Sequence, residues 1–129
     1  MILSLTLNEA EKLSTALFRL AFDEHAINDR ERFVCISLAR KIDFEHFEQS
    51  AAPPLFILDD EQEKMMKKAF SREYNKFIQK YQNVEDKIYA DVCSQDFQLQ
   101  KEIWAELDYC KKTLKEYMAI ADKLMDKKL

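Results

Sequence analysis

The apolar residues near the start of the chain recur at steps of three and four, which is the period of an amphipathic α-helix. The stripe consists of Leu7, Ala10, Leu13, Leu17, Leu20 and Ala21. Thr6 and Glu9 have the T-x-x-E spacing of a capping box, and Leu5 and Ala10 have the spacing of a hydrophobic staple. The pattern therefore predicts a helix that begins after Thr6 and ends at about His25.

A second helix is predicted directly after this one. Asn28 and Glu31 have the spacing of another capping box. Apolar residues then fall on several sides of the helix, at Phe33, Val34, Cys35, Leu38 and Ile42. A helix that is apolar on several sides is expected to lie deep in a bundle. It should reach about Ala52, before Pro53-Pro54, and the short link makes residues 1–52 an antiparallel helical hairpin.

The segment Leu55–Leu58 is an uninterrupted run of four apolar residues. A single strand cannot form a sheet, and the pattern identifies no second strand in this chain. The segment can fill the core, pair with another chain, or turn directly into the next helix. Core filling is the favoured interpretation.

The second half of the chain carries two long stripes with heptad spacing. They are Phe70, Tyr74, Phe77, Tyr81, Val84 and Ile88, and then Ile103, Leu107, Cys110, Leu114, Tyr117, Ala121 and Leu124. Asp60 and Glu63 fit the N-terminal cap of the first of these helices, Asn83 could interrupt it, and a break is expected at Ser94 or Asp96. Two helices of about 30 residues each span about 45 Å. They predict an antiparallel, coiled-coil-like hairpin.

These patterns predict an all-α fold, a helical bundle with an N-terminal helical hairpin and a long C-terminal antiparallel coiled-coil-like hairpin. We expect a single helical domain over 1–129. It comprises the hairpin at 1–52, a Pro-Pro linker at 53–59 and the long hairpin at 60–129.

Composition narrows the classes of function. The chain contains no glycine. Tight β-hairpins and the glycine loops that approach phosphate groups are therefore not expected. The three cysteines, Cys35, Cys93 and Cys110, have no CxxC spacing, so neither a disulfide framework nor a zinc site is predicted. We expect buried thiols, no bridge between Cys93 and Cys110, and no metal or other cofactor.

Two further absences concern location. The first residues, MILSLTLNEAEK, lack the basic region and the long apolar run of a signal peptide. No window approaches the roughly 18 apolar residues of a membrane span. These features predict a cytoplasmic protein without a membrane partner.

The net charge of −4 is distributed in blocks along the chain. Residues 42–63 hold seven acids and no base, and residues 64–80 hold six bases and one acid. Residues 81–110 hold seven acids against two bases, and residues 111–129 hold six bases against three acids. An antiparallel hairpin then has a basic end and an acidic end, and like charges side by side cost stability.

Three arrangements would compensate these charges. The acidic segment 42–63 can cover the basic end of its own hairpin, which is the favoured interpretation. Two chains can pack head to tail as a homodimer. A foreign partner can supply the opposite charge.

The two histidines, His25 and His46, each follow an arginine by six residues, Arg19 and Arg40. This R-x(4–6)-H spacing resembles the catalytic motif of the HEPN ribonuclease group, whose members are all-helical. The resemblance implies cleavage of RNA by its own 2′-hydroxyl, with Arg40 and His46 paired across a dimer. The residue after each arginine departs from the Asn, Asp or His usual in the motif. A helical ribonuclease or toxin is therefore the second hypothesis.

Bases interleaved with aromatic residues at 64–80 could suggest nucleic-acid binding, but the aromatic residues lie on the heptad stripe. The acidic net charge also disfavours direct nucleic-acid binding. The more unusual feature is the acidic segment around the Pro-Pro linker, because linkers often carry recognition residues. Its candidate partner-binding residues are Phe44, Glu45, Phe47, Glu48, Phe56, Asp59 and Asp60.

The leading hypothesis is thus a non-enzymatic protein–protein interaction module, and we expect a homodimer. Its partner is another protein with a basic surface. An inhibitor or antagonist of a nucleic-acid-processing protein is a special case within this class. A virion or scaffold component is the third hypothesis, which self-assembly beyond a dimer would mark.

Overall fold

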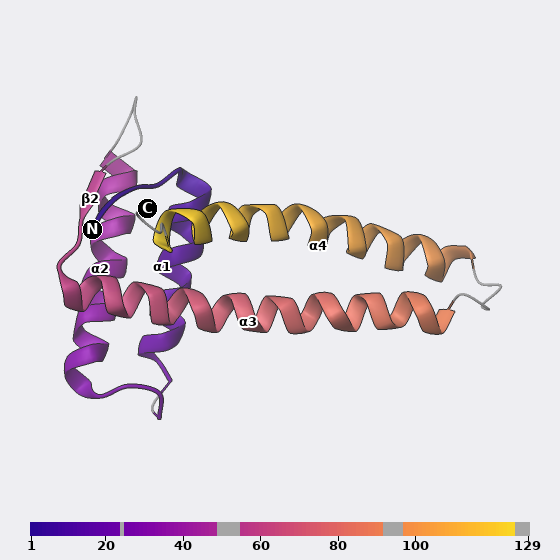
Figure 1. The fold of residues 1–129 in the computed structure, drawn as a ribbon, viewed down its shortest axis with the longest axis horizontal. Coiled ribbons are helices and arrows are strands. Elements are labelled where there is room, and N and C mark those ends of the chain that lie inside the picture. Colours follow the sequence, from indigo (N-terminus) through magenta and orange to yellow (C-terminus); the bar gives the residue numbers. More distant parts are fainter. Residues whose placement is uncertain (24, 49–54, 92–96, 126–129) are drawn as a thin grey trace. The chain divides into compact units, whose positions relative to one another are not determined.

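A computed structural model of the chain describes residues 1–23, 25–48, 55–91 and 97–125 (Figure 1). The predicted all-α class is confirmed. The described residues form four helices, α1 (Leu7–Ala21), α2 (Asp29–Glu48), α3 (Asp60–Asp91) and α4 (Phe97–Leu124), and two short strands, β1 (Ile2–Ser4) and β2 (Leu55–Ile57).

The chain divides into two compact units, Met1–Glu73 and Tyr74–Leu129, and the boundary lies within α3. The predicted linker at 53–59 does not separate these units. The expectation of a single domain over the whole chain stays a prediction. The two units are described separately below.

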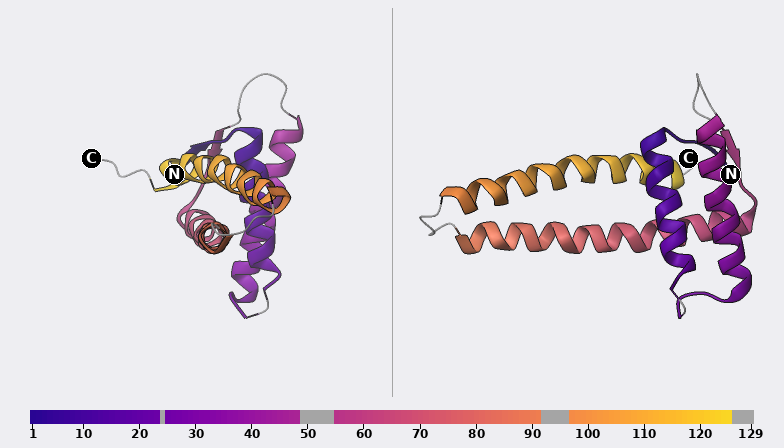
Figure 2. Two further views of the ribbon diagram at one scale, coloured as in Figure 1. Left: turned by 90° about the vertical axis from the view of Figure 1, so that its right-hand side faces the viewer. Right: turned by 180° about the vertical axis from the view of Figure 1, so that it is seen from behind.

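The first unit contains the predicted N-terminal helical hairpin. Helices α1 and α2 lie side by side and run antiparallel (Figure 1 and Figure 2). Both predicted capping boxes are present. The Glu9 N–H donates to Thr6 Oγ1 (3.2 Å) and the Thr6 N–H to Glu9 Oε1 (2.9 Å). The Glu31 N–H donates to Asn28 Oδ1 (2.8 Å) and the Asn28 N–H to Glu31 Oε1 (3.2 Å).

Helix α1 ends at Ala21, four residues before the predicted end at His25. The Asp23 carboxylate explains the difference in local terms. It accepts a hydrogen bond from the His25 N–H at 3.2 Å, and such a side-chain bond competes with continuation of the helix. Helix α2 is described to Glu48, and its predicted end near Ala52 lies outside the described residues.

The apolar segment at 55–58 is half of a two-stranded antiparallel sheet. β1 pairs with β2 in the register Ile2↔Ile57, Leu3↔Phe56 and Ser4↔Leu55. The sequence reasoning missed the second strand, which lies within the first residues of the chain. The favoured interpretation of this segment, core filling, is correct for every second residue. Phe56 and Leu58 are buried, whereas Leu55 and Ile57 are exposed.

Helix α3 begins one residue earlier than the predicted cap implies. The capping pair is Asp59 with Gln62, and not Asp60 with Glu63. The Gln62 N–H donates to Asp59 Oδ1 (2.8 Å), and the Asp59 N–H donates to Gln62 Oε1 (3.1 Å). Glutamine at the third helical position completes this reciprocal box as well as glutamate does.

The second unit is the predicted long helical hairpin, built from α4 and from α3 after Glu73. The two helices run antiparallel (Figure 2). Phe77, Val84, Leu107 and Cys110 form its core cluster, as the heptad spacing predicts. The Phe77 ring stacks on Tyr117, with the ring centroids 5.0 Å apart. Asn83 is exposed and does not interrupt α3, while the predicted break at Ser94 or Asp96 lies outside the described residues.

Candidate functional site

The predicted partner-binding residues fall into two groups in the structure. Phe44, Glu45, Phe47 and Glu48 belong to the last turns of α2, and their side chains lie outside the described residues. The three others lie at the junction of β2 and α3. They are Phe56, Asp59 and Asp60.

Phe56 corrects the expectation of an exposed contact residue. Only 1% of its surface is exposed, and it pairs with Leu3 of β1. The strand alternation turns this ring inward and its two neighbours outward. Phe56 therefore stabilises the fold and presents no surface to a partner in this conformation.

Three aliphatic side chains share the opposite face of the same sheet. Ile2 is 70% exposed, Leu55 is 68% exposed and Ile57 is 72% exposed. Ile2 lies opposite Ile57 in the register, and Leu55 follows two residues away on the same side of β2. We call these three residues the outer sheet face. Exposed Asp59 and Asp60 follow β2 after buried Leu58, and we call them the acidic border of this face.

The backbone of β2 also has free hydrogen-bonding capacity along one edge. Met1 and Leu58 exchange both hydrogen bonds, from the Leu58 N–H to the Met1 oxygen (2.8 Å) and from the Met1 amino group to the Leu58 oxygen (3.1 Å). In an antiparallel pair such positions alternate with positions that face outward. The N–H and C=O groups of Leu55 and Ile57 therefore point away from β1, and no described residue pairs with them.

Arg40 and His46, the candidate ribonuclease pair, are only half described. Arg40 is exposed on α2, and the side chain of His46 lies outside the described residues. At the other R-x(4–6)-H match, the Arg19 Nη1 donates to Glu73 Oε2 at 2.8 Å, and His25 is exposed. The ribonuclease hypothesis stays a prediction.

Ion pairs of the first unit show how part of the blocky charge is compensated. Arg72 pairs with Asp23, and Arg30 binds Glu61 through two hydrogen bonds of 2.9 and 3.0 Å. The pair of Lys67 with Glu63, at 2.8 Å, joins the acidic segment 42–63 to the basic block 64–80. Arg72 is instead neutralised from the α1–α2 link. The bond from the His25 N–H, together with Arg72, lowers the pKa of Asp23.

The described residues offer little for covalent or metal chemistry. Cys35 and Cys110 are buried, as expected, and Cys93 lies outside the described residues. Burial raises the pKa of Cys35 to about 11, and burial also raises the pKa of Cys110. Such thiols stay protonated near neutral pH and are poor nucleophiles. Within the described ranges, no three His, Cys, Asp or Glu side chains gather where they could hold a metal ion.

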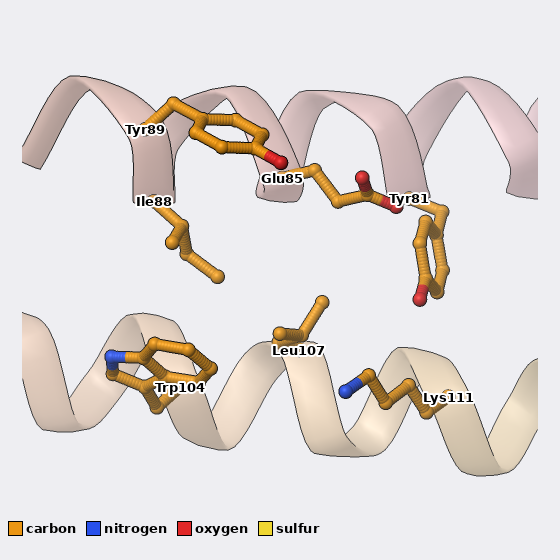
Figure 3. Close-up of a pocket in the computed structure, with 7 residues that line it drawn as sticks. All are labelled: Tyr81, Glu85, Ile88, Tyr89, Trp104, Leu107 and Lys111. Atoms are coloured by element: carbon orange, nitrogen blue, oxygen red, sulfur yellow. The ribbon is translucent and has the colours of Figure 1, made fainter. Parts of the chain in front are cut away.

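A groove of about 370 Å³ lies between the two helices of the second unit (Figure 3). Apart from the adjacent residues Ile88 and Tyr89, its walls are residues spaced by three, four or seven along each helix, which places them on one side of that helix. They are Tyr81, Glu85, Ile88 and Tyr89 of α3, and Trp104, Leu107 and Lys111 of α4. We call this feature the hairpin groove.

The hairpin groove combines an apolar floor, exposed aromatic rings and both signs of charge. Ile88 and Leu107 point toward each other from the facing helices (Figure 3). Tyr89 is 75% exposed and Trp104 is 53% exposed. Neither Glu85 nor Lys111 has an ion-pair partner within the described part of the chain. The sequence pattern did not predict this groove, although Tyr89 and Trp104 each directly follow a residue of the predicted stripes.

No helix in the described ranges is both long and apolar enough to cross a lipid bilayer. Comparison of the chain with protein-family models, with curated proteins and with solved structures finds no match.

Proposed function

We propose that this protein is a non-enzymatic interaction module that binds another protein through the outer sheet face and its acidic border. One observation carries the proposal. Three large aliphatic side chains, Ile2, Leu55 and Ile57, are each about 70% exposed on one face of one small sheet. Adjacent exposed aliphatic side chains with a polar rim are typical of protein interaction sites.

The outward backbone groups of β2 support a defined mode of binding. An extended segment of a partner can add to such an edge as a third strand, with main-chain hydrogen bonds to Leu55 and Ile57. Its alternate apolar side chains would lie beside the outer sheet face. No Lys or Arg lies between Leu55 and Asp60 to discourage this pairing.

The charge beside the sheet indicates the chemistry of the partner. Asp59 and Asp60 are exposed at the end of β2, and the sequence places Glu45 and Glu48 in the same acidic block. A partner segment with apolar residues and adjacent lysine or arginine would match both features. Basic surfaces are common on proteins that bind nucleic acid. An inhibitor of such a protein is therefore a special case of the proposed function.

Capture of a partner by matched variants tests the proposal. The tagged chain is incubated with extract of its source cells, and bound proteins are quantified for each variant. Leu55→Thr with Ile57→Thr removes two of the three aliphatic side chains of the outer sheet face, and threonine is β-branched and favours strands. Asp59→Asn with Asp60→Asn removes the charge, and asparagine at position 59 still caps α3.

The controls alter equally exposed residues elsewhere in the first unit. Phe33→Gln removes an exposed apolar side chain from α2, and Glu11→Gln removes an exposed carboxylate from α1. We expect a partner that the wild type and both controls retain and both sheet variants lose. Equal capture by all five proteins would contradict the proposal.

A further inference from the structure

We infer that two copies of this chain associate head to tail through their hairpin grooves. The site lies in the second unit, whereas the proposed partner site lies in the first. The inference therefore does not depend on the proposed function. It rests on the polarity of charge along the hairpin and on the composition of the groove.

The two halves of the hairpin carry opposite charge. The Phe77–Tyr117 stack fixes which parts of the helices face each other. Because the helices are antiparallel, residues near 85 of α3 lie opposite residues near 109 of α4. Residues 81–91 and 97–110 form one half, which holds the acids Glu85, Asp86, Asp91, Glu102, Glu106 and Asp108 against the bases Lys87 and Lys101. Residues 74–80 and 111–125 form the other half, which holds the bases Lys76, Lys80, Lys111, Lys112, Lys115 and Lys123 against the acids Glu116 and Asp122.

Within one copy, each half thus carries a net charge of one sign, and the like charges in excess repel each other. Glu85 and Lys111 line the groove at the boundary between the two halves. A second copy turned by 180° places its basic half against the acidic half of the first. The same rotation places the acidic half of the second copy against the basic half of the first. The repulsion between like charges is therefore reduced in both halves. This is the complementarity that a two-fold symmetric interface requires.

The groove carries one acidic and one basic residue at positions that allow ion pairs between two copies. Lys111 lies near the Tyr81 end and Glu85 lies toward the middle (Figure 3). A two-fold axis that crosses the groove at the level of Tyr81 and Glu85 brings Glu85 of each copy toward Lys111 of the other. Two equivalent ion pairs would result. A foreign partner would have to present both signs of charge in this register, whereas a second copy does so by symmetry.

The association would also cover exposed apolar surface. A pair of helices buries only a narrow seam, and here Trp104 and Tyr89 remain largely exposed beside it. Two such pairs packed face to face form a four-helix bundle, in which each pair covers the open face of the other. The floor residues Ile88 and Leu107 would then lie in the shared core.

A charge-swap series measured by sedimentation equilibrium tests the inference on the full-length chain. We expect a wild-type dimer at low salt whose dissociation constant rises about tenfold or more at high salt, because the pairing is electrostatic. Glu85→Lys and Lys111→Glu, made singly, should each weaken the dimer by about tenfold or more. Each change acts twice in a symmetric interface. The double variant should return to within about threefold of the wild type.

Matched controls separate local pairing from net charge and folding. Glu11→Lys and Lys41→Glu make the same charge changes at exposed sites of the first unit and should leave dimerisation unchanged. Far-ultraviolet circular dichroism should give equal helicity for all variants. A chain that is monomeric at every concentration and salt would overturn the inference. So would a dimer that neither single groove variant weakens, or a double variant that stays as weak as the singles.

Discussion

The two units of this protein bury their apolar residues to different depths. The first unit encloses Leu5, Leu17, Leu38, Ile42 and Met65 so completely that none has measurable exposure. In the described part of the second unit, a core cluster of Phe77, Val84, Leu107 and Cys110 is buried, and so are Ile103, Ile120 and Leu124. Ile78, Tyr81, Ile88, Leu114 and Tyr117 are partly exposed beside that cluster. A pair of helices leaves the side chains at the edges of its seam partly exposed. The partly exposed side chains beside the core cluster of the second unit are therefore apolar surface that an added partner would cover.

Their exposed surfaces differ in a second way. The outer sheet face is bordered by Asp59 and Asp60, so one sign of charge flanks it. The hairpin groove contains both Glu85 and Lys111. A surface with charges of one sign requires a partner with charges of the opposite sign. A surface that carries both positive and negative charges can instead match a second copy of itself. The two surfaces therefore have different proposed partners.

Core truncations should show the largest difference between the units. Leu38→Ala removes a fully buried side chain from the first unit and should lower the free energy of unfolding by about 2–5 kcal/mol. Leu114→Ala removes a partly exposed one from the second unit and should cost about 1 kcal/mol. Urea denaturation followed by circular dichroism measures both. Equal losses would contradict the contrast in packing.

The next effect concerns the ion pairs of the first unit. Glu73 is buried and pairs with Arg19, whereas Glu61 and Arg30 form an exposed pair. Arg19→Ala should lower the free energy of unfolding by about 1–3 kcal/mol, because it leaves a buried carboxylate without its cation. Arg30→Ala is the matched control and should cost about 0–1 kcal/mol. Urea denaturation measures both losses. If the Arg19 variant were no less stable than the Arg30 variant, the pair of Arg19 with Glu73 would not stabilise the fold in this way.

A smaller effect separates the two roles of Asp59, which caps α3 and borders the outer sheet face. Asp59→Ala removes the cap and should lower the free energy of unfolding by about 1 kcal/mol. Asp59→Asn keeps a good capping residue and should be nearly neutral. Thermal unfolding of both variants measures this. If asparagine destabilised as much as alanine, the charge and not the cap would be the important property.

The smallest effect is a dependence on pH at the α1–α2 link. The pKa of Asp23 is lowered in the folded chain, so its contribution to stability is present above the ordinary pKa near 3.8 and is lost as pH falls below it. Asp23→Asn should therefore be less stable than the wild type at pH 7, and the gap should narrow toward pH 3. Denaturation at both pH values measures the gap. A gap that is constant with pH would show that the Asp23 charge is unimportant.

Local patterns in the sequence predicted the parts of this fold that depend on neighbouring residues. The caps at Thr6 and Asn28 and the heptad seam through Phe77 and Val84 are of this kind. The sheet was missed because each strand has only three residues, too few for a recognisable alternation. Its pairing joins Ile2 to Ile57, a separation that no local pattern encodes.

The candidate sites were predictable to a lesser degree, for the same reason. Asp59 and Asp60 stood out because acids cluster along the sequence, but burial of Phe56 depends on its partner strand. The hairpin groove depends on the register between α3 and α4. Trp104 and Tyr89 become neighbours of one groove only when the two helices pair.

The most direct test of the account is whether the two surfaces act separately. Light scattering coupled to size-exclusion chromatography, at low salt, compares Ile57→Thr on the sheet with Lys111→Glu in the groove. We predict a dimer for the wild type and for Ile57→Thr, and a shift toward monomer for Lys111→Glu. A dimer that Ile57→Thr dissociates and Lys111→Glu leaves intact would contradict it, because self-association would then belong to the outer sheet face.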